Sequence, residues 1–372
     1  MSLDIDALLG DRDVRIIVCC GSGGVGKTTT AAALALRAAE KHDRRAVVLT
    51  IDPARRLAQS LGLTELSNTP RTVEQARGGQ LDAMMLDMKR TFDEVVLSHT
   101  SEEKAAEIFA NPFYQAMSST FSGTQEYMAM EKLAQLRAAD SWDLIVVDTP
   151  PSRSALDFLD APQRLARFLD GKMLRLLLAP ARGGRSVFSV MTAATSFFTN
   201  TIAKILGGRL LTDIGTFVAS LDSTFGGFRQ RAEQTYRVLQ DRETAFLVVA
   251  TPEPDAVREA AYFAGRLTEE RMPLAGLILN RVHTTGVAGL SAQRSLGAAE
   301  GLEEHGLSPV TAGVLRIHAD LVAQAEREER VAGRFTTAHP GVPTTRVAAQ
   351  AGDVHDLEAL RHVGDLLAAD GQ

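Results

Sequence analysis

The stretch Gly21-Ser22-Gly23-Gly24-Val25-Gly26-Lys27-Thr28-Thr29 decides the fold of this chain. The apolar residues 14–20 before it predict a buried parallel strand, and the alanine- and leucine-rich residues 30–40 after it predict a helix. A glycine, four residues, a second glycine, lysine and threonine form the phosphate-binding P-loop pattern, and this pattern belongs between a strand and a helix. We therefore expect a phosphate-binding loop where the first strand ends.

Each residue type in this loop suits phosphate binding. Glycines let backbone N–H groups wrap around phosphates, and the helix that follows adds its positive N-terminal end. Lys27 places a cation on the outer phosphates, and the Thr28 hydroxyl is a suitable Mg²⁺ ligand. The predicted nucleotide-binding residues in the loop are Gly21, Ser22, Gly23, Gly24, Val25, Gly26, Lys27, Thr28 and Thr29.

Composition narrows the class of protein. The chain has 372 residues, 45% hydrophobic and 23% charged, as in globular proteins that fold in water. A net charge of −6 and the absence of a basic stripe argue against nucleic acid as the main partner. The adjacent Cys19 and Cys20 form neither a disulfide framework nor a CxxC metal pair, so we expect two small apolar side chains in a reduced core.

The sequence also bears on location. The N-terminal residues include Asp4 and Asp6 where a signal peptide needs basic residues. The most apolar segments, residues 173–181 and 187–206, are too short or too often polar to span a bilayer. We expect a cytoplasmic protein, with peripheral attachment to a membrane left open.

Asp52 follows a second predicted strand, residues 46–51. Loops at the carboxyl ends of strands carry the chemistry of α/β sheets. Asp52 is therefore a candidate catalytic carboxylate that orients or deprotonates a water for attack on a γ-phosphate. It is equally well placed as the N-cap of a helix over residues 54–61, with Pro53 at the first helical position.

Asp148 ends another apolar strand, residues 143–147, and Thr149, Pro150 and Pro151 follow it. This arrangement has the Walker B form, in which the aspartate holds Mg²⁺ directly or through water, opposite Thr28. The segment after it could then respond to the γ-phosphate as a switch. An aspartate at a strand end is often only a helix N-cap, but its pairing with a P-loop favours the metal role.

Two later strands complete the predicted sheet. Residues 246–250 end before Thr251-Pro252, and residues 274–279 end at Asn280. An asparagine there can hydrogen-bond the edge of an adenine, although from residue type alone a turn residue is the better interpretation. We also expect a strand at 81–86, a short edge strand at 313–315, a solvated charged helix face at 326–329, a loop at 336–345 and a closing helix at 356–369.

Between these strands the pattern is mainly helical, over residues 89–139 and 154–240. Residues 173–211 are rich in Met, Phe and Leu, which indicates either an apolar groove for a client or membrane, or simple packing between helices. The predicted fold is a single α/β P-loop NTPase domain (1–372), a mostly parallel twisted sheet flanked by helices, with its core at 12–88, 140–160 and 243–372 and an inserted helical subdomain at 89–139 and 161–242.

These motifs together resemble the ArsA-type ATPases, within the larger MinD/ParA-like class. That family includes the arsenite-pump ATPase and the ATPase that delivers tail-anchored membrane proteins, and actinobacterial proteins described as anion-transporting ATPases are similar too. The resemblance rests on the P-loop, on Asp52-Pro53-Ala54 as switch I, on residues 81–92, and on Asp148-Thr149-Pro150-Pro151-Ser152 as switch II. The loop Thr251-Pro252-Glu253 and Asn280 are similar to its adenine-side elements.

The resemblance implies a nucleotide-sandwich dimer with ATP and Mg²⁺ at the interface, and a helical subdomain that changes between open and closed states. It implies that Lys27, Thr28 and Thr29 bind phosphate and Mg²⁺, that Asp52 orients the attacking water, and that Asp148 supports the metal. The implied partners are a second ATPase chain, as homodimer or heterodimer, and a hydrophobic helical client or membrane protein.

One departure shapes the functional hypothesis. The family places a second lysine after the first glycine, reaching the partner's phosphates, but Ser22 stands there. We therefore hypothesise one half of an asymmetric dimer whose other half is a lysine-bearing paralogue, or a site in which Arg153 supplies the missing cation. The alternative is a nucleotide-gated targeting module with little hydrolysis. Tail-anchored targeting is less favoured because the CxxC of that branch is missing.

Overall fold

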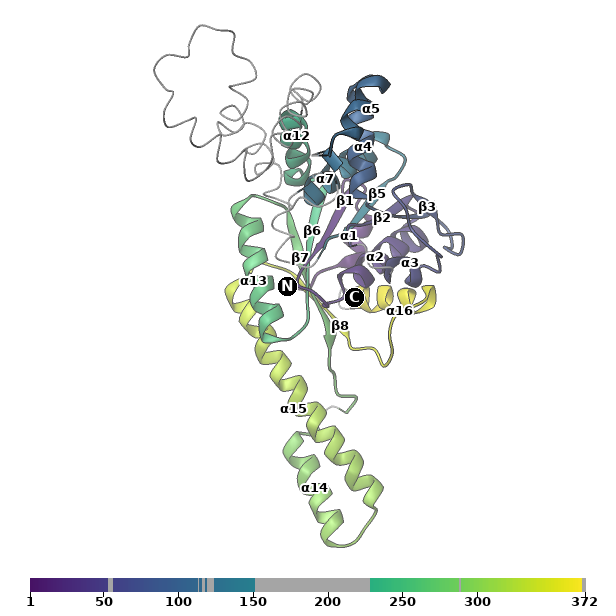
Figure 1. Cartoon of the computed structure of the whole chain (residues 1–372). Helices are drawn as coiled ribbons and strands as arrows, with labels where there is room; N and C mark the ends of the chain where they lie inside the picture. Colours follow the sequence, from purple (N-terminus) through teal and green to yellow (C-terminus); the bar gives the residue numbers. More distant parts are fainter. Residues whose placement is uncertain are drawn as a thin grey trace, which may run out of the picture. The chain divides into compact units, whose positions relative to one another are not determined.

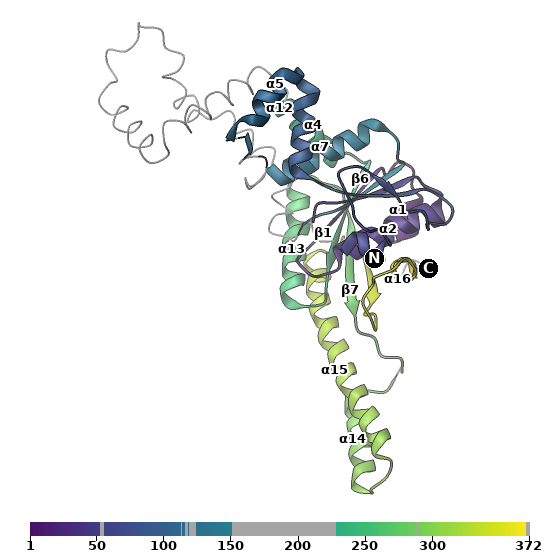
Figure 2. The same ribbon diagram turned by 45° about the vertical axis from the view of Figure 1, so that its right-hand side comes forward.

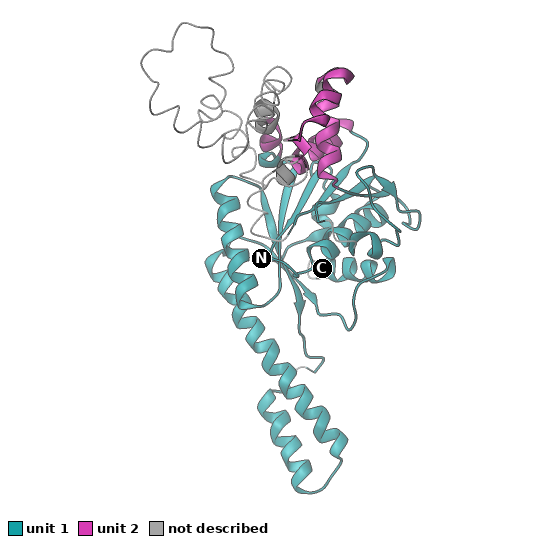
Figure 3. Cartoon of the chain, in the orientation of Figure 1, with its two compact units in different colours: residues 1–85, 140–155, 239–372 teal, residues 86–139, 156–238 magenta. Residues whose placement is uncertain are grey.

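The computed structural model describes residues 1–52, 56–112, 114–115, 118, 124–150, 228–287 and 289–369. The chain divides into two compact units (Figure 3). Unit 1 comprises Met1–Met85, Asp140–Ala155 and Leu239–Gln372, and unit 2 comprises Leu86–Ala139 and Leu156–Val238. The sheet and the P-loop belong to unit 1.

Unit 1 is built on an eight-stranded sheet in the order β3-β4-β2-β5-β1-β6-β7-β8 (Figure 1). The strands are β1 (Ile16–Cys20), β2 (Ala46–Thr50), β3 (Arg71–Thr72), β4 (Leu81–Met85), β5 (Leu144–Asp148), β6 (Thr244–Ala250), β7 (Leu274–Val282) and β8 (Thr344–Ala348). The short β3 pairs antiparallel with β4, and the other pairs are parallel. The predicted mostly parallel α/β fold is confirmed.

The centre of the sheet is covered on both faces. Every residue of β1, β2, β5 and β6 is buried, which explains why these strands are nearly continuous apolar runs. The helices of the described residues in unit 1 are α1 (Ile5–Gly10), α2 (Lys27–His42), α3 (Arg56–Ser60), α13 (Pro254–Glu269), α14 (Ala292–Glu304), α15 (Pro309–Ala338) and α16 (Leu357–Ala369); α12 (Phe228–Gln240) begins in unit 2 and ends in unit 1.

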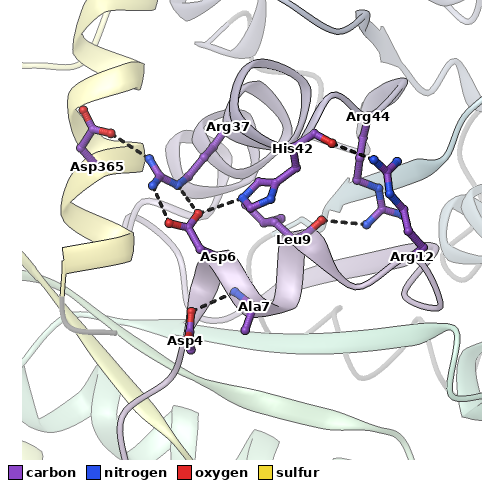
Figure 4. Close-up of polar contacts among 9 residues, drawn as sticks. All are labelled: Asp4, Asp6, Ala7, Leu9, Arg12, Arg37, His42, Arg44 and Asp365. Carbon is purple, nitrogen blue, oxygen red and sulfur yellow. Dashed lines mark hydrogen bonds and ion pairs between the residues drawn. The ribbon is translucent and has the colours of Figure 1, made fainter. Parts of the chain in front are cut away.

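Two arginines fix the helix that follows the P-loop. Arg37 on α2 donates through Nε and Nη2 to the carboxylate of Asp6 on α1, both at 2.7 Å, and through Nη1 to Asp365 on α16 at 2.8 Å (Figure 4). The hydrogen bonds from Arg37 lower the pKa of Asp6 to about 2. Arg44, just after α2, is fully buried, and burial lowers its pKa to about 10. Its guanidinium donates to the backbone carbonyls of Leu9, Asp11, Val14 and Asp143.

The described part of unit 2 is helical, with α4 (Met88–His99), α5 (Glu102–Ala110) and α7 (Thr124–Ala139). The ring of Tyr114 packs edge-on against Phe92, and its hydroxyl donates to Asp93 at 2.5 Å. Lys132 on α7 pairs with Glu94 on α4 at 3.0 Å. The predicted helices over residues 89–139 are therefore present, whereas the apolar stretch 173–211 lies outside the described residues.

Three predictions near the C-terminus are wrong. Residues 313–315 belong to α15 rather than to an edge strand, because Ala312, Leu315 and Ala319 recur at helical spacing and outweigh the local Gly-Val-Leu. The edge strand is β8, which begins inside the stretch predicted as a loop at 336–345. The helix face at 326–329 is not simply solvated, because Glu328 is buried and bonded to His283.

Candidate functional site

The P-loop joins β1 to α2, and two of its glycines are required by close approach. A Cβ on Gly21, at φ 151°, would lie 2.0 Å from the carbonyl oxygen of Val249 on β6. A Cβ on Gly26, at φ 96°, would lie 2.3 Å from Nδ2 of Asn280 on β7. These contacts hold the loop tightly over the ends of β1, β6 and β7, so that its backbone is shaped before any ligand arrives.

Lys27 is the first residue of α2, and its side chain is largely buried. Its Nζ donates to the backbone carbonyl of Ser22 at 2.8 Å, so the lysine spans its own loop. Burial lowers the pKa of Lys27, and the charges of Asp148 and Asp52 act in the opposite sense. Among the described residues this buried cation donates to a neutral carbonyl, which suits it to an incoming phosphate because phosphate is a stronger, charged acceptor.

Asp148 ends β5 directly beside the loop and is completely buried. Its Oδ2 accepts from the hydroxyls of Thr28 and Thr50, at 2.7 and 2.8 Å. Its Oδ1 has no hydrogen-bond partner among the described residues. Burial raises the pKa of Asp148 to about 6. A buried carboxylate oxygen without a partner, next to a threonine hydroxyl, is the donor set that Mg²⁺ takes at a P-loop, so the residues fit this metal.

Asp52 lies two residues beyond the end of β2 and is half-buried. Its backbone N–H donates to Thr50 Oγ1 at 3.2 Å. The charge of its carboxylate raises the pKa values of both Lys27 and Asp148. Because residues 53–55 lie outside the described residues, the alternative role of Asp52 as a helix N-cap stays a prediction.

Asn280 lies inside β7, which continues to Val282, and not at its end as the sequence suggested. Its Nδ2 donates to the carbonyl of Val25 in the P-loop at 2.8 Å, and its Oδ1 accepts from the backbone of Arg281 at 3.0 Å. These two bonds use one of the two N–H groups and one of the two lone pairs of the amide, so the predicted contact with an adenine edge stays a prediction. The buried Pro252 follows the neighbouring strand β6, on the same side of the site.

The structure therefore brings the predicted site residues to one edge of the sheet. Sequence reasoning missed Thr50, whose hydroxyl shares Asp148 with Thr28, and the contact between Asn280 and the P-loop. The available signal for Thr50 was a hydroxyl residue at the end of a strand, two positions before the candidate catalytic Asp52. The described residues contain no group of three or more His, Cys, Asp or Glu side chains that could hold a metal.

A protein with this sheet and this loop is a P-loop nucleotide-binding protein. The model of the anion-transporting ATPase family, ArsA_ATPase, matches residues 14–289, and the chain belongs to that family. Among the helices of the described residues, none is long and apolar enough to cross a membrane.

Curated relatives support this assignment at low identity. The ATPase GET3 of Malassezia globosa is 28% identical over 163 residues, 44% of this chain and 46% of that protein. The ATPase get3 of Aspergillus terreus is 28% identical over 195 residues, 50% of this chain and 56% of that protein. The ATPase ASNA1 homolog of Cryptosporidium parvum is 24% identical over 279 residues, which are 75% of this chain and 68% of that protein. The chain thus spans about half the length of the first two relatives.

Proposed function

We propose that this protein is a Mg²⁺-dependent ATPase of the ArsA type. The observation that carries the proposal is the Oδ1 of buried Asp148, which lies beside the Thr28 hydroxyl and has no hydrogen-bond partner in the described ranges. A buried carboxylate in this state destabilises the empty protein, and such groups concentrate where a ligand later satisfies them. Membership of the anion-transporting ATPase family supports the same activity.

The roles of the residues follow from their positions. Lys27, which now donates to the Ser22 carbonyl, would turn to the outer phosphates, and Thr28 and Asp148 would hold the metal. A bound Mg²⁺ supplies neutralisation of the charge that develops on the transferred phosphoryl group. Asp52 orients the attacking water, and Asn280 with Pro252 receives the adenine.

The test compares two lysines on the same helix. Lys27→Ala should abolish binding of a fluorescent ATP analogue and ATP turnover, because the buried cation at the phosphates is lost. Lys41→Ala, in the exposed last turn of α2, should leave both unchanged. Undiminished turnover in the Lys27→Ala protein would contradict the proposal.

The missing second lysine makes a sharper proposal about the dimer. Ser22 cannot extend a cation toward another subunit, so we expect a pair of these chains to hydrolyse ATP slowly, and a lysine-bearing paralogue to accelerate turnover at this chain's P-loop. Ser22→Lys should then raise turnover of the isolated chain on the order of tenfold or more, because it restores a charge contact at the developing phosphate charge. Ser22→Gln is the control of similar length without charge and should not raise it.

A nucleotide-gated binding module with little hydrolysis is the alternative, and its client-binding segment, residues 173–211, lies outside the described residues, as does Arg153. The same assays separate the two functions. ATP binding that needs Lys27, without measurable turnover in the presence of a lysine-bearing paralogue, would favour the binding module. The cytoplasmic location stays a prediction.

A further inference from the structure

Helix α15 has one long apolar face, and the C-terminal half of this face packs against the rest of unit 1. The helix contains 30 residues, about 45 Å at 1.5 Å per residue. Its C-terminal half contacts α13 and β7. In this half, the residues of the packed face are buried or half-buried and recur at intervals of three or four: Leu321, Gln324, Glu328, Ala332 and Phe335. This spacing defines a single side of the helix.

The same face continues toward the N-terminus of α15, where none of the described residues buries it. Stepping back from Leu321 at the same intervals gives Ile317, Val314 and Val310, which are 70%, 59% and 79% exposed. We call these three residues the outer stripe. A surface helix normally turns such a row of β-branched apolar side chains toward a core. Here the N-terminal part of α15, which carries the row, extends beyond the sheet, as the ribbons of Figure 1 and Figure 2 show.

Helices α14 and α15 follow each other in the chain and pack together as a helical hairpin, but α14 does not cover the outer stripe. Helix α14 packs against the opposite side of α15, where Ala312 and Ala319 are buried, and its own Ser295 and Ala299 are buried toward that side. Across the hairpin, Arg316 donates to both carboxylate oxygens of Glu303, at 3.0 and 2.6 Å. Helix α14 and the N-terminal half of α15 thus form an arm with one apolar face left over.

The arm is firmly held at its base. Glu328 accepts from the backbone N–H of His283 at 2.8 Å and contacts its ring Nδ1 at 2.7 Å. Gln324 donates to the same carboxylate at 3.0 Å, and Arg346 on β8 pairs with Glu329. The outer stripe is therefore presented in a defined direction and is not part of a loose terminus.

We propose that the outer stripe is an interaction surface for the outer stripe of a second copy of this chain, with the two α15 helices antiparallel. The intervals of four, three and four residues from Val310 to Leu321 are those of the a and d positions of a coiled coil. Antiparallel pairing sets Val314 opposite Ile317 of the second copy, and Val310 opposite Leu321 of the second copy. The stripe is thus complementary to itself, as a two-fold interface requires.

Position and charge agree with this occupant. The second α15 would begin opposite Leu321, where the chain's own unit stops covering the face. Within residues 309–319 the one formal charge is Arg316, which is paired inside the arm, so no like charges oppose each other across the stripe. The antiparallel arrangement also keeps the two positive helix N-termini apart.

The small area that this pairing would bury favours weak association. Each copy would contribute on the order of 500 Å², and the pair about 1,000 Å², which is the lower limit for specific interfaces. We expect reversible association in the micromolar range rather than a permanent dimer. The contact is separate from the nucleotide edge, so it does not depend on the proposed ATPase function.

Sedimentation velocity over a concentration series, without nucleotide, tests the proposal. The wild-type chain should associate as its concentration rises. Val314→Asp and Ile317→Asp should each weaken association about tenfold or more, because pairing would bury a carboxylate against apolar side chains. Ala298→Asp, on the exposed outer side of α14, should change nothing. Circular dichroism checks that the variants stay folded, and monomer at every concentration, or equal association of all variants, would overturn the proposal.

Cross-linking tests the orientation. A Val314→Cys chain mixed with an Ile317→Cys chain of different length should give a mixed dimer with a short bis-maleimide, several-fold more than either variant alone. Cys19 and Cys20 are buried and form no background. Preferential self-linking of Val314→Cys would instead show a parallel pair and overturn the antiparallel arrangement. The Lys27→Ala chain should pair like wild type, so a failure of ATP binding and a failure of pairing are read separately.

Discussion

The P-loop and the arm are two parts of the same unit, and they use opposite means to prepare for a partner. At the P-loop, buried polar groups are incompletely satisfied within the described part of the chain: Lys27 donates to one backbone carbonyl, and Asp148 Oδ1 has no hydrogen-bond partner there. On the arm, the groups that await a partner are the exposed apolar side chains of the outer stripe. The first arrangement suits the proposed phosphate and Mg²⁺ through shape and charge, and the second suits the proposed helix partner through apolar area.

The largest expected difference between the P-loop region and the arm is in the stability lost when one arginine is removed from each. Arg44→Ala should lower the free energy of unfolding by about 3–5 kcal/mol, because four backbone carbonyls near the P-loop helix would lose their buried donor. Arg316→Ala on the arm should cost much less, because both Arg316 and its partner Glu303 are exposed and water screens their attraction. Urea unfolding of both variants measures the difference, and equal losses would contradict it.

Two glycines give the next largest contrast. Gly21→Ala should cost about 3 kcal/mol and abolish ATP binding, because its Cβ would collide with the Val249 backbone carbonyl at a left-handed φ. Gly313→Ala on α15 meets no atom within 4 Å and should stabilise the chain by about 0.5–1 kcal/mol. Thermal melting checks both signs. A stable Gly21→Ala protein that binds ATP would show that the loop is less constrained than its contacts indicate.

The smallest effect concerns acid stability. The hydrogen bonds from Arg37 lower the pKa of Asp6 to about 2, from 3.8 in the unfolded chain. Its stabilisation is therefore complete above about pH 4 and is lost as the pH falls through 2. Asp6→Asn should flatten the loss of stability between pH 4 and pH 2, as followed by urea midpoints. The exposed Asp13→Asn serves as the control, and an unchanged slope in Asp6→Asn would remove this role of the Arg37 pair.

The sequence alone predicted the sheet and the P-loop region well because local rules dominate there. Buried parallel strands leave long apolar runs, and the loop pattern carries its own steric logic. Thr50, Asn280 and Arg44 make their decisive contacts with residues far along the chain, at Asp148, Val25 and Leu9. No local pattern reports such pairings, so their roles could only come from the structure.

The C-terminal errors have a related cause. From the sequence, Glu328 is interpreted as a solvated charge, because its partner His283 lies 45 positions earlier and meets it only in the folded chain. The residues 313–315 read as a strand because two of them are large and apolar, and the helix that contains them is recognisable only over a longer window. Local propensity failed where an element's length or a distant partner decided the outcome.

Asn280 and His283 occupy the same short segment of β7 and its exit, one touching the P-loop and the other the base of α15. At about 3.3 Å per residue, the two contacts lie roughly 10 Å apart. Val310 lies 18 residues before Glu328, about 27 Å along the helix. A tilt of about 5° at Glu328 would therefore carry the tip of the arm through roughly 2 Å. The length of α15 thus turns a small change of angle at its base into a larger displacement at its tip.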